Sequence, residues 1–141
     1  MKHLLIIFTL LLTSVSSSED VNFNDLVSRK GLFYEKFTDE PFTGKVFGFE
    51  RGYIKAGKID GEWLEYHRNG QLLIKGFYIN GLLEGERTAY WDNGMLMHKD
   101  NYEKGIKNGE FLSYHKNGKQ WLRHYYKDGK QEGEQLWYHE N

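Results

Sequence analysis

A repeat with a period of 24 residues constrains the fold of this 141-residue chain more than any other feature. From residue 57 onward no insertion interrupts the period. A glycine, a Gly-Glu pair, a tyrosine and an Asn-Gly pair recur in phase. They fall at Gly57, Gly81, Gly105 and Gly129; at Gly61-Glu62, Gly85-Glu86, Gly109-Glu110 and Gly133-Glu134; at Tyr66, Tyr90, Tyr114 and Tyr138; and at Asn69-Gly70, Asn93-Gly94 and Asn117-Gly118. Agreement at so many fixed offsets indicates a tandem repeat array.

Each unit contains two runs of aromatic and branched residues, which in the first unit are 62–67 and 71–79. Turn residues flank both runs, which is typical of a β-hairpin. No helical i, i+3, i+4 stripe of apolar residues continues across the Asn-Gly pairs. We therefore predict an all-β chain in which tandem 24-residue hairpins form one elongated antiparallel meander sheet, after an N-terminal signal peptide.

The turn inside each hairpin has two candidate geometries. A two-residue Asn-Gly loop would be type I′, whereas a three-residue loop would be a type I turn followed by a left-handed glycine. We favour the three-residue loop. Gly70, Gly94 and Gly118 are then structural turn glycines, and we expect them to tolerate substitution poorly because a left-handed backbone disfavours a β-carbon.

This loop sets the predicted register of the sheet. It pairs Leu64 and Tyr66 with Leu72 and Ile74, so the even-numbered positions would form the more apolar face. The odd-numbered face would carry a row of aromatic and cationic groups, although a thin sheet also needs apolar cover on both faces. From that row we take six candidate binding residues, which are Trp63, Arg87, Trp91, Trp121, Arg123 and Trp137.

The start of the chain has the pattern of a secretory signal peptide. A short basic start precedes the nine-residue apolar run Leu4–Leu12, and small residues follow as far as Ser18. The apolar run is too short to span a bilayer as a permanent helix. We predict a signal peptide at residues 1–18 that is cleaved near Ser16–Ser18, and an exported protein that is periplasmic or secreted.

The rest of the chain divides into three predicted parts. Residues 19–30 form a lead-in that is either a short helix or irregular, and residues 31–56 form an atypical N-terminal hairpin. Such a hairpin would cap the array, since an end unit lacks a neighbour. The repeats occupy residues 57–141, with units at 57–80, 81–104 and 105–128 and a partial unit at 129–141.

The charge balance and the absence of cysteine limit the classes of function and the sources of stability that the chain can have. The chain has 19 basic and 20 acidic residues, so it lacks the strongly basic balance of a nucleic-acid-binding protein. It has no cysteine, so disulfides cannot reinforce a small core. Stacking of neighbouring hairpins must then provide the stability.

Catalytic and metal chemistry are not predicted. His67, His115 and His139 share one repeat slot, but equal slots in adjacent hairpins lie about 9.6 Å apart, too far for ligands that must each be about 2.1 Å from one zinc ion. The repeated glutamates of the Gly-Glu pairs share that spacing and lack the different environments that separate an acid from a base. No catalytic triad order or nucleotide fingerprint occurs. We therefore expect no catalytic residues, no metal, no cofactor and no enzyme activity.

The unit at residues 57–70, Gly-Lys-x-x-Gly-Glu-Trp-x-x-Tyr-x-x-Asn-Gly, resembles the bacterial variant of the MORN repeat. The segment 31–46 looks like the leading segment of the same family, whose members are commonly labelled YwqK-type antitoxins. The resemblance covers residues 28–141. It implies a hairpin-repeat fold without catalytic residues, and an antitoxin-like or immunity-like role.

Two function classes follow. The first is a scaffold that binds another protein, since tryptophan, tyrosine and arginine are favoured at interfaces. The second is a module that binds envelope glycan or lipid headgroups at a membrane or cell-envelope surface, which the export signal and the tryptophans favour. The oligomeric state and the partner's identity do not follow from the sequence.

Overall fold

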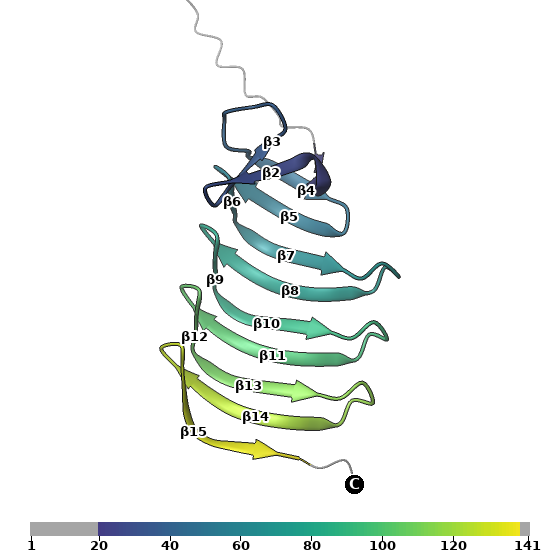
Figure 1. Ribbon diagram of the computed structural model, residues 1–141, viewed down its shortest axis with the longest axis vertical. Coiled ribbons are helices and arrows are strands. Elements are labelled where there is room, and N and C mark those ends of the chain that lie inside the picture. Colours follow the sequence, from purple (N-terminus) through teal and green to yellow (C-terminus); the bar gives the residue numbers. More distant parts are fainter. Residues whose placement is uncertain (1–19, 139–141) are drawn as a thin grey trace, which may run out of the picture.

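Successive hairpins lie side by side in one large sheet that runs along the long axis of the molecule (Figure 1). The structure is a computed structural model that describes residues 20–138. The predicted signal peptide at residues 1–18 and its cleavage site lie outside these residues. The predicted all-β array of consecutive hairpins in one sheet is confirmed.

Each repeat supplies two long strands and one strand of two residues. The long strands are β7 (Gly61–Tyr66) and β8 (Leu72–Ile79), β10 (Gly85–Tyr90) and β11 (Leu96–Glu103), and β13 (Gly109–Tyr114) and β14 (Gln120–Lys127). The short strands are β6 (Lys58–Ile59), β9 (Leu82–Leu83) and β12 (Ile106–Lys107). The final described strand is β15 (Lys130–Trp137). Neighbouring strands of the repeats pair antiparallel throughout this series.

The N-terminal part of the chain closes one end of the sheet. It contains β1 (Val21–Asn22), the 3-10 helix η1 (Phe23–Asp25), β2 (Leu26–Arg29), β3 (Leu32–Glu35), β4 (Gly44–Phe47) and β5 (Glu50–Lys55). β1 pairs in parallel with β4, so the large sheet is mixed rather than purely antiparallel. β2 and β3 form a separate two-stranded sheet. The predicted lead-in thus contains one short helical turn between two strands.

An apolar cluster fills this end of the molecule. Its buried members are Phe42, Val46, Ile54 and Trp63, and residues of β1, η1, β2 and β3 pack against them. Trp63 is only 2% exposed. The N-terminal segment therefore covers the apolar face of the first hairpin, as an end unit requires.

The predicted three-residue turn loops are confirmed at one edge of the sheet, which we call the rim. In the first of them the Gly70 N–H donates to His67 O over 2.9 Å, and the His67 N–H donates to Gln71 O over 2.8 Å. Gly70 has φ +84°, and its counterparts Gly94 and Gly118 have +81° and +83°. These are type I turns that each end on a left-handed glycine.

A β-bulge follows each rim turn. Tyr66 pairs with Leu72, but Glu65 pairs with Ile74, so Leu73 is an extra residue that forms a β-bulge. The pairing shifts at the same place in the next two hairpins. The residues in the slot of Leu73 are there Met97 and Trp121.

The bulge reverses the predicted faces beyond the turn, because a shift of one residue moves every following side chain to the other side. Leu64 lies opposite Lys75 and not opposite Ile74. The predicted even-numbered apolar face is therefore wrong. Odd positions of β7 share a face with even positions of β8, and the same holds in the later hairpins.

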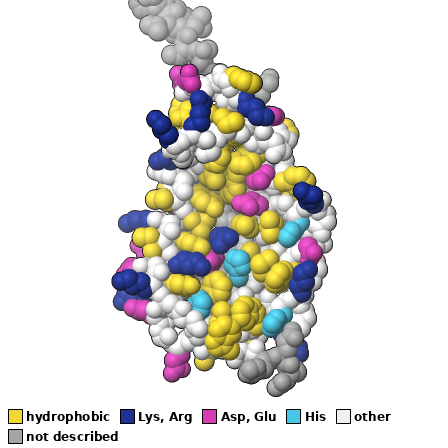
Figure 2. Space-filling view, viewed as in Figure 1, with side chains coloured by type: hydrophobic (Ala, Val, Ile, Leu, Met, Phe, Trp, Pro, Cys, Tyr) yellow, Lys and Arg dark blue, Asp and Glu magenta, His cyan; other side chains and the backbone are white. Residues whose placement is uncertain are grey.

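We call the face that carries Trp63, Gly76 and Tyr78 with their counterparts the inner face, and the opposite one the outer face. An added β-carbon at Gly76 would lie 3.0 Å from Leu83 Cδ1, so the short strand β9 packs closely on the inner face. In Figure 2 apolar side chains run down the middle of the visible face, with histidines and basic side chains among them.

The edge opposite the rim is made of fold-back turns, in which two successive residues have positive φ. They are Ala56-Gly57, Asn80-Gly81, Lys104-Gly105 and Asp128-Gly129, with φ between 47° and 80°. This geometry is type I′. It explains the glycine that recurs at Gly57 and its counterparts.

Each fold-back turn is hydrogen-bonded to the preceding repeat. The Gly81 N–H donates to Ile59 O and the Gly105 N–H to Leu83 O, each over 2.8 Å. The Gly129 N–H donates to Lys107 O over 2.9 Å. The turns thus stack along the array, and each repeat needs its neighbour to satisfy its backbone.

The rim turn predicts a measurable difference between two substitutions at Gly70. A β-carbon there would meet no atom within 4 Å, so only the left-handed backbone opposes it. We expect Gly70→Ala to lower the free energy of unfolding by about 1 kcal/mol. Gly70→Asn should cost less, because asparagine tolerates this conformation. Urea unfolding of both variants measures the difference, and equal stability of Gly70→Ala and the wild type would contradict the turn geometry.

Candidate functional site

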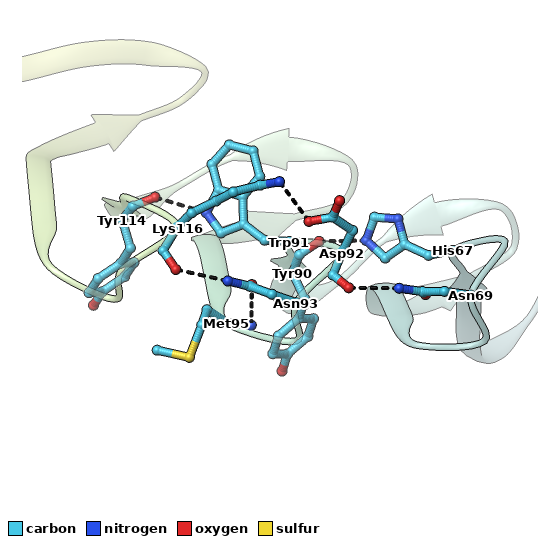
Figure 3. A network of polar contacts seen from close by, with 9 residues as sticks. All are labelled: His67, Asn69, Tyr90, Trp91, Asp92, Asn93, Met95, Tyr114 and Lys116. Atoms are coloured by element: carbon cyan, nitrogen blue, oxygen red, sulfur yellow. Dashed lines mark hydrogen bonds and ion pairs between the residues drawn. The ribbon is translucent and has the colours of Figure 1, made fainter.

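Asparagines link the rim turns of successive repeats (Figure 3). The Asn69 side-chain amide donates to Asp92 O over 2.7 Å, and that of Asn93 donates to Lys116 O over 2.9 Å. Each side-chain oxygen also accepts from the backbone N–H two residues ahead, at 3.0 Å and 3.1 Å. The asparagine at this position therefore stabilises its own turn and is also hydrogen-bonded to the turn of the next repeat.

The residue at the position of His67 in the repeat forms a second hydrogen bond to the following repeat. His67 Nε2–H donates to Tyr90 O over 2.9 Å, and Trp91, one repeat later, donates from Nε1 to Tyr114 O over 3.1 Å. The ring nitrogen of His67 is thus engaged with backbone. Across residues 20–138 no group of three or more histidine or acidic side chains comes together as metal ligands.

A groove of about 590 Å³ lies on the inner face beside the rim, between the second and third repeats. Its volume falls within the range of small-ligand pockets. Two tryptophans from different repeats form its walls. The lining residues are Trp91, Met97, His98, Ser113, Tyr114, His115, Lys116 and Trp121.

The bonds of Trp91 hold one wall of the groove in place. Its indole N–H is bonded to the backbone of the next repeat, as described above. The Lys116 ammonium lies 5.6 Å from the ring centroid, where it makes a cation–π contact. Lys116 also forms an ion pair with Asp92 at 2.7 Å. The indole face is therefore oriented before any ligand arrives.

The other wall is held as firmly. Trp121 Nε1–H donates to Ser113 Oγ over 2.8 Å, and Ser113 Oγ–H donates to Met97 O over 3.2 Å. The ring centroid of Trp121 lies 5.2 Å from that of Trp137 and 5.9 Å from that of His115. Both indole N–H groups of the groove are thus engaged within the chain, and its walls offer ring faces rather than donors.

The six residues predicted to bind do not share one face. Trp91, Trp121 and Trp137 come together at the groove, and Trp137 is 56% exposed. Trp63 is buried in the N-terminal cluster, so its indole is not available to a partner. Arg123 lies on the outer face in an ion pair with Glu110 at 2.6 Å.

The placement of these residues follows from the bulge. Trp121 occupies the bulge itself, so its ring reaches the inner face, while Arg123 two residues later points outward. Sequence reasoning missed His98 as a groove residue for the same reason, and Met97 was not among the six candidate residues although it was placed on the same face as Trp91 and Trp121. Leu73, Met97 and Trp121 occupy the same position of the 24-residue period, and this shared position is the signal in the sequence that relates Met97 to Trp121.

Arg87 belongs to a charged cluster on the inner face. Asp100 is 1% exposed, and its Oδ2 accepts from the Tyr102 hydroxyl over 3.0 Å. The same oxygen lies 3.5 Å from Arg87 Nη1 and 3.4 Å from Lys107 Nζ. Two cations therefore share one buried carboxylate.

This cluster occupies positions that hold apolar residues one period earlier. Arg87, Asp100 and Lys107 occupy the slots that hold Trp63, Gly76 and Leu83 one repeat earlier. One period later again, the same slots hold Phe111, His124 and Gln131. The inner face thus changes from apolar to charged to aromatic along the array.

Two histidines stack on opposite sides of Phe111. Its ring centroid lies 5.9 Å from that of His98 and 4.6 Å from that of His124. Burial lowers the pKa of both histidines. Lys107 lowers both values further, Arg87 also lowers that of His98, and Asp100 opposes these effects at His98.

The glutamates of the first three Gly-Glu pairs lie on the outer face and form ion pairs across their hairpins. Glu62 pairs with Lys75 at 2.6 Å and Glu86 with Lys99 at 2.5 Å. Like the pair of Arg123, these lie at the surface and contribute little stability each. Each of these three carboxylates has a cation as its partner, which is a structural arrangement.

Comparison with known proteins identifies the repeat. Residues 59–80 and 83–104 each match the MORN repeat variant. The chain therefore contains repeats of the MORN variant. No curated protein matches it. MORN repeats are in general modules that bind proteins or lipids, and they are typically non-catalytic.

The matched segments coincide with structural units. The first MORN segment contains β7 and β8, and the second contains β10 and β11. The hairpin of β13 and β14 continues the same spacing and register, so the groove is formed between the second MORN segment and its successor. No helix among residues 20–138 is long and apolar enough to cross a membrane.

The partly buried His98 and the buried His124 predict that acid destabilises the repeat array. Below pH 6.5, the ordinary pKa of histidine, the unfolded chain binds protons that folded His98 and His124 bind only at lower pH. Stability is therefore retained above pH 6.5 and lost as the pH falls, by at most about 1.4 kcal/mol per pH unit for each histidine. Urea unfolding between pH 7.5 and 5.5 measures this loss.

A double variant, His98→Phe with His124→Phe, provides the control for this measurement. It should show a smaller loss than the wild type over the same pH range, because phenylalanine preserves the stack on Phe111 and cannot be protonated. The same pH dependence in both proteins would contradict the role assigned to these histidines.

Proposed function

We propose that this MORN-repeat protein is an exported, non-enzymatic scaffold that binds another protein through the groove between Trp91 and Trp121. The observation that carries the proposal is the engagement of both indole N–H groups within the chain. A rigid aromatic groove of this kind suits an apolar side chain of a partner, the usual centre of a protein interface. Trp137 extends the aromatic surface beside it.

The polar groups of the groove favour a protein over a glycan. Sugars are held by several hydrogen bonds in addition to ring stacking, but Ser113 Oγ is already both donor and acceptor. Lys116 is ion-paired. Among the described residues of the groove the polar atoms are thus largely engaged, and binding must rely on apolar contact.

We also propose that the protein is exported and has an immunity-like role. The pattern of residues 1–18 supports export to the periplasm or the medium. The resemblance to the YwqK-type family supports an antitoxin-like role against a protein that acts in the same compartment. Binding to envelope glycan or to lipid headgroups is the second candidate function, which the tryptophans at the groove favour.

The test is retention of a protein partner from an envelope extract of the source cells. We expect the full chain to retain a stoichiometric partner, and the double variant Trp91→Ala with Trp121→Ala to lose it. The purified partner should bind this variant at least about tenfold more weakly, which corresponds to the loss of about 1.4 kcal/mol. Thermal melts confirm that each variant is folded.

The matched control removes two aromatic side chains from the outer face, Phe77→Ala with Tyr125→Ala, whose residues are 49% and 50% exposed. This variant should bind the partner as the wild type does. Partner binding that persists in the groove variant would contradict the proposal. Co-sedimentation with isolated peptidoglycan or with liposomes, lost only in the groove variant, would favour the second function.

A further inference from the structure

An ion pair that recurs on the outer face follows from the register of each hairpin. Glu62 pairs with Phe77, and Lys75 precedes Phe77 by two residues, so the glutamate and the lysine are diagonal neighbours on one face. The same contact recurs one and two periods later. The ion pairs are Glu62 with Lys75, Glu86 with Lys99 and Glu110 with Arg123.

The N-terminal hairpin of β4 and β5 breaks this pattern by a charge reversal. Its register places Lys45 where the first repeat has Glu62. It places Arg51 where the first repeat has Lys75. Gly44-Lys45 thus stands in place of a Gly-Glu pair, and Arg51 has a second cation across the hairpin instead of a carboxylate.

Arg51 is held in place without an acidic partner. Its Nε–H donates to Gly48 O over 3.2 Å, and its Cζ lies 4.5 Å from the ring centroid of Tyr66, where it makes a cation–π contact. Among residues 20–138 no acidic side chain forms an ion pair with Arg51, and neither of its Nη groups has an acceptor. The guanidinium is therefore oriented, and its two Nη groups are free to bind a ligand.

Arg51 lines a cavity of about 270 Å³ at the rim, where the N-terminal hairpin meets the first repeat. Among the described residues that line this cavity, which we call the Arg51 cavity, it is the one that carries a charge. Asn22, Asn24 and Phe49 also line it, and Phe49 is 49% exposed. The cavity thus combines one cation with neutral polar groups and an aromatic surface.

The acidic residues of the elements around the cavity do not neutralise Arg51. Glu50 and Glu65 lie opposite each other across β5 and β7 on the inner face, whereas the neighbouring Arg51 points to the outer face. The acidic residues of η1 and of the outer face of β7 are engaged in ion pairs. These pairs are Asp25 with Lys36 and Glu62 with Lys75.

We propose that the Arg51 cavity binds a carboxylate group, which the two Nη groups of Arg51 hold as a bidentate pair. Phe49 would provide apolar contact to the carbon chain that carries the carboxylate. Such a group belongs either to a free small acid or to a protein, as a side chain or a chain end. The cavity shares no residue with the groove between Trp91 and Trp121, so this site is additional to the proposed function.

Other ligand classes fit the cavity less well. A cationic ligand would be repelled by Arg51, and an uncharged ligand would leave the guanidinium without a counter-charge. Recognition of phosphate groups on proteins uses clusters of arginines, whereas a single arginine lines this cavity. The charge of the cavity therefore favours a monoanion.

Titration of the full chain at low ionic strength tests the proposal, since salt screens an exposed charge. Acetate represents a free acid, N-acetylglycine a chain end and N-acetylglutamic acid α-amide a side chain, and the corresponding amides are their uncharged counterparts. Inorganic phosphate is the fourth anion. Binding is followed by the NMR signals of Arg51 Nε–H and of the side-chain amides of Asn22 and Asn24.

We expect each carboxylate to bind at least about tenfold more tightly than its amide, because hydrogen bonds to charged groups are stronger than neutral ones. Phosphate should bind more weakly than the tightest carboxylate. The carboxylate that binds most tightly identifies the source of the natural ligand as a free acid, a chain end or a side chain.

Four variants test the assignment to Arg51, and thermal melts confirm that each is folded. Arg51→Gln should abolish the preference for acids over amides, and Arg51→Lys should weaken acetate binding by about threefold or more, because lysine keeps the charge but loses the planar fork. Lys45→Glu restores a Gly-Glu pair, whose carboxylate should occupy Arg51 and weaken acetate binding by about tenfold or more. Arg123→Gln is the matched control, since Arg123 already has Glu110 as its partner, and it should change nothing.

Equal binding of acids and amides, or tighter binding of phosphate than of every carboxylate, would overturn the inference. So would the absence of a shift at Arg51, or undiminished acetate binding in Arg51→Gln, Arg51→Lys or Lys45→Glu. The probes and their signals do not involve Trp91 or Trp121, so these outcomes are independent of whether a protein partner binds the groove.

Discussion

The hydrogen bonds between successive repeats are the interactions on which the rest of the structure depends. At one edge a glycine N–H in each fold-back turn reaches a carbonyl of the preceding repeat. At the rim, Asn69 and Asn93 reach carbonyls of the following repeat. A hairpin in isolation is marginal in water, so these links, with the sheet pairing, convert unstable units into an array.

The turns at both edges recur in successive repeats, whereas the residues in the middle of the inner face differ between repeats. Trp63, Gly76 and Leu83 occupy three inner-face positions, and one period later Arg87, Asp100 and Lys107 take their places. A buried charge cluster contributes less stability than the well-packed apolar residues it replaces.

The sequence specified the array, the hairpins and the rim turns, because glycine and asparagine have few alternatives at positions that require a left-handed backbone. It did not specify the bulge after each turn, because Leu73, Met97 and Trp121 share no property that demands one. The assignment of side chains to faces failed for this reason. The bulge is set by twist and pairing of the whole sheet, which single-residue preferences do not report.

The candidate site was predictable in part. Trp91, Trp121 and Trp137 stood out by residue type, and the structure brings them together. Trp63 was indistinguishable from them in sequence, since only the cap formed by the N-terminal segment buries it. Likewise, the asparagines were read as turn residues, and their links to the next repeat became visible only when neighbouring turns were placed side by side.

Hydrogen exchange at the fold-back glycines tests the dependence of each repeat on its neighbour most directly. The amides of Gly81, Gly105 and Gly129 lie in turns at the edge of the sheet, where a turn without a partner would exchange freely. NMR exchange should show these amides protected at least about a hundredfold, and opening together with the strand amides. Exchange at the rate of an unstructured peptide, while the strands stay protected, would contradict the account.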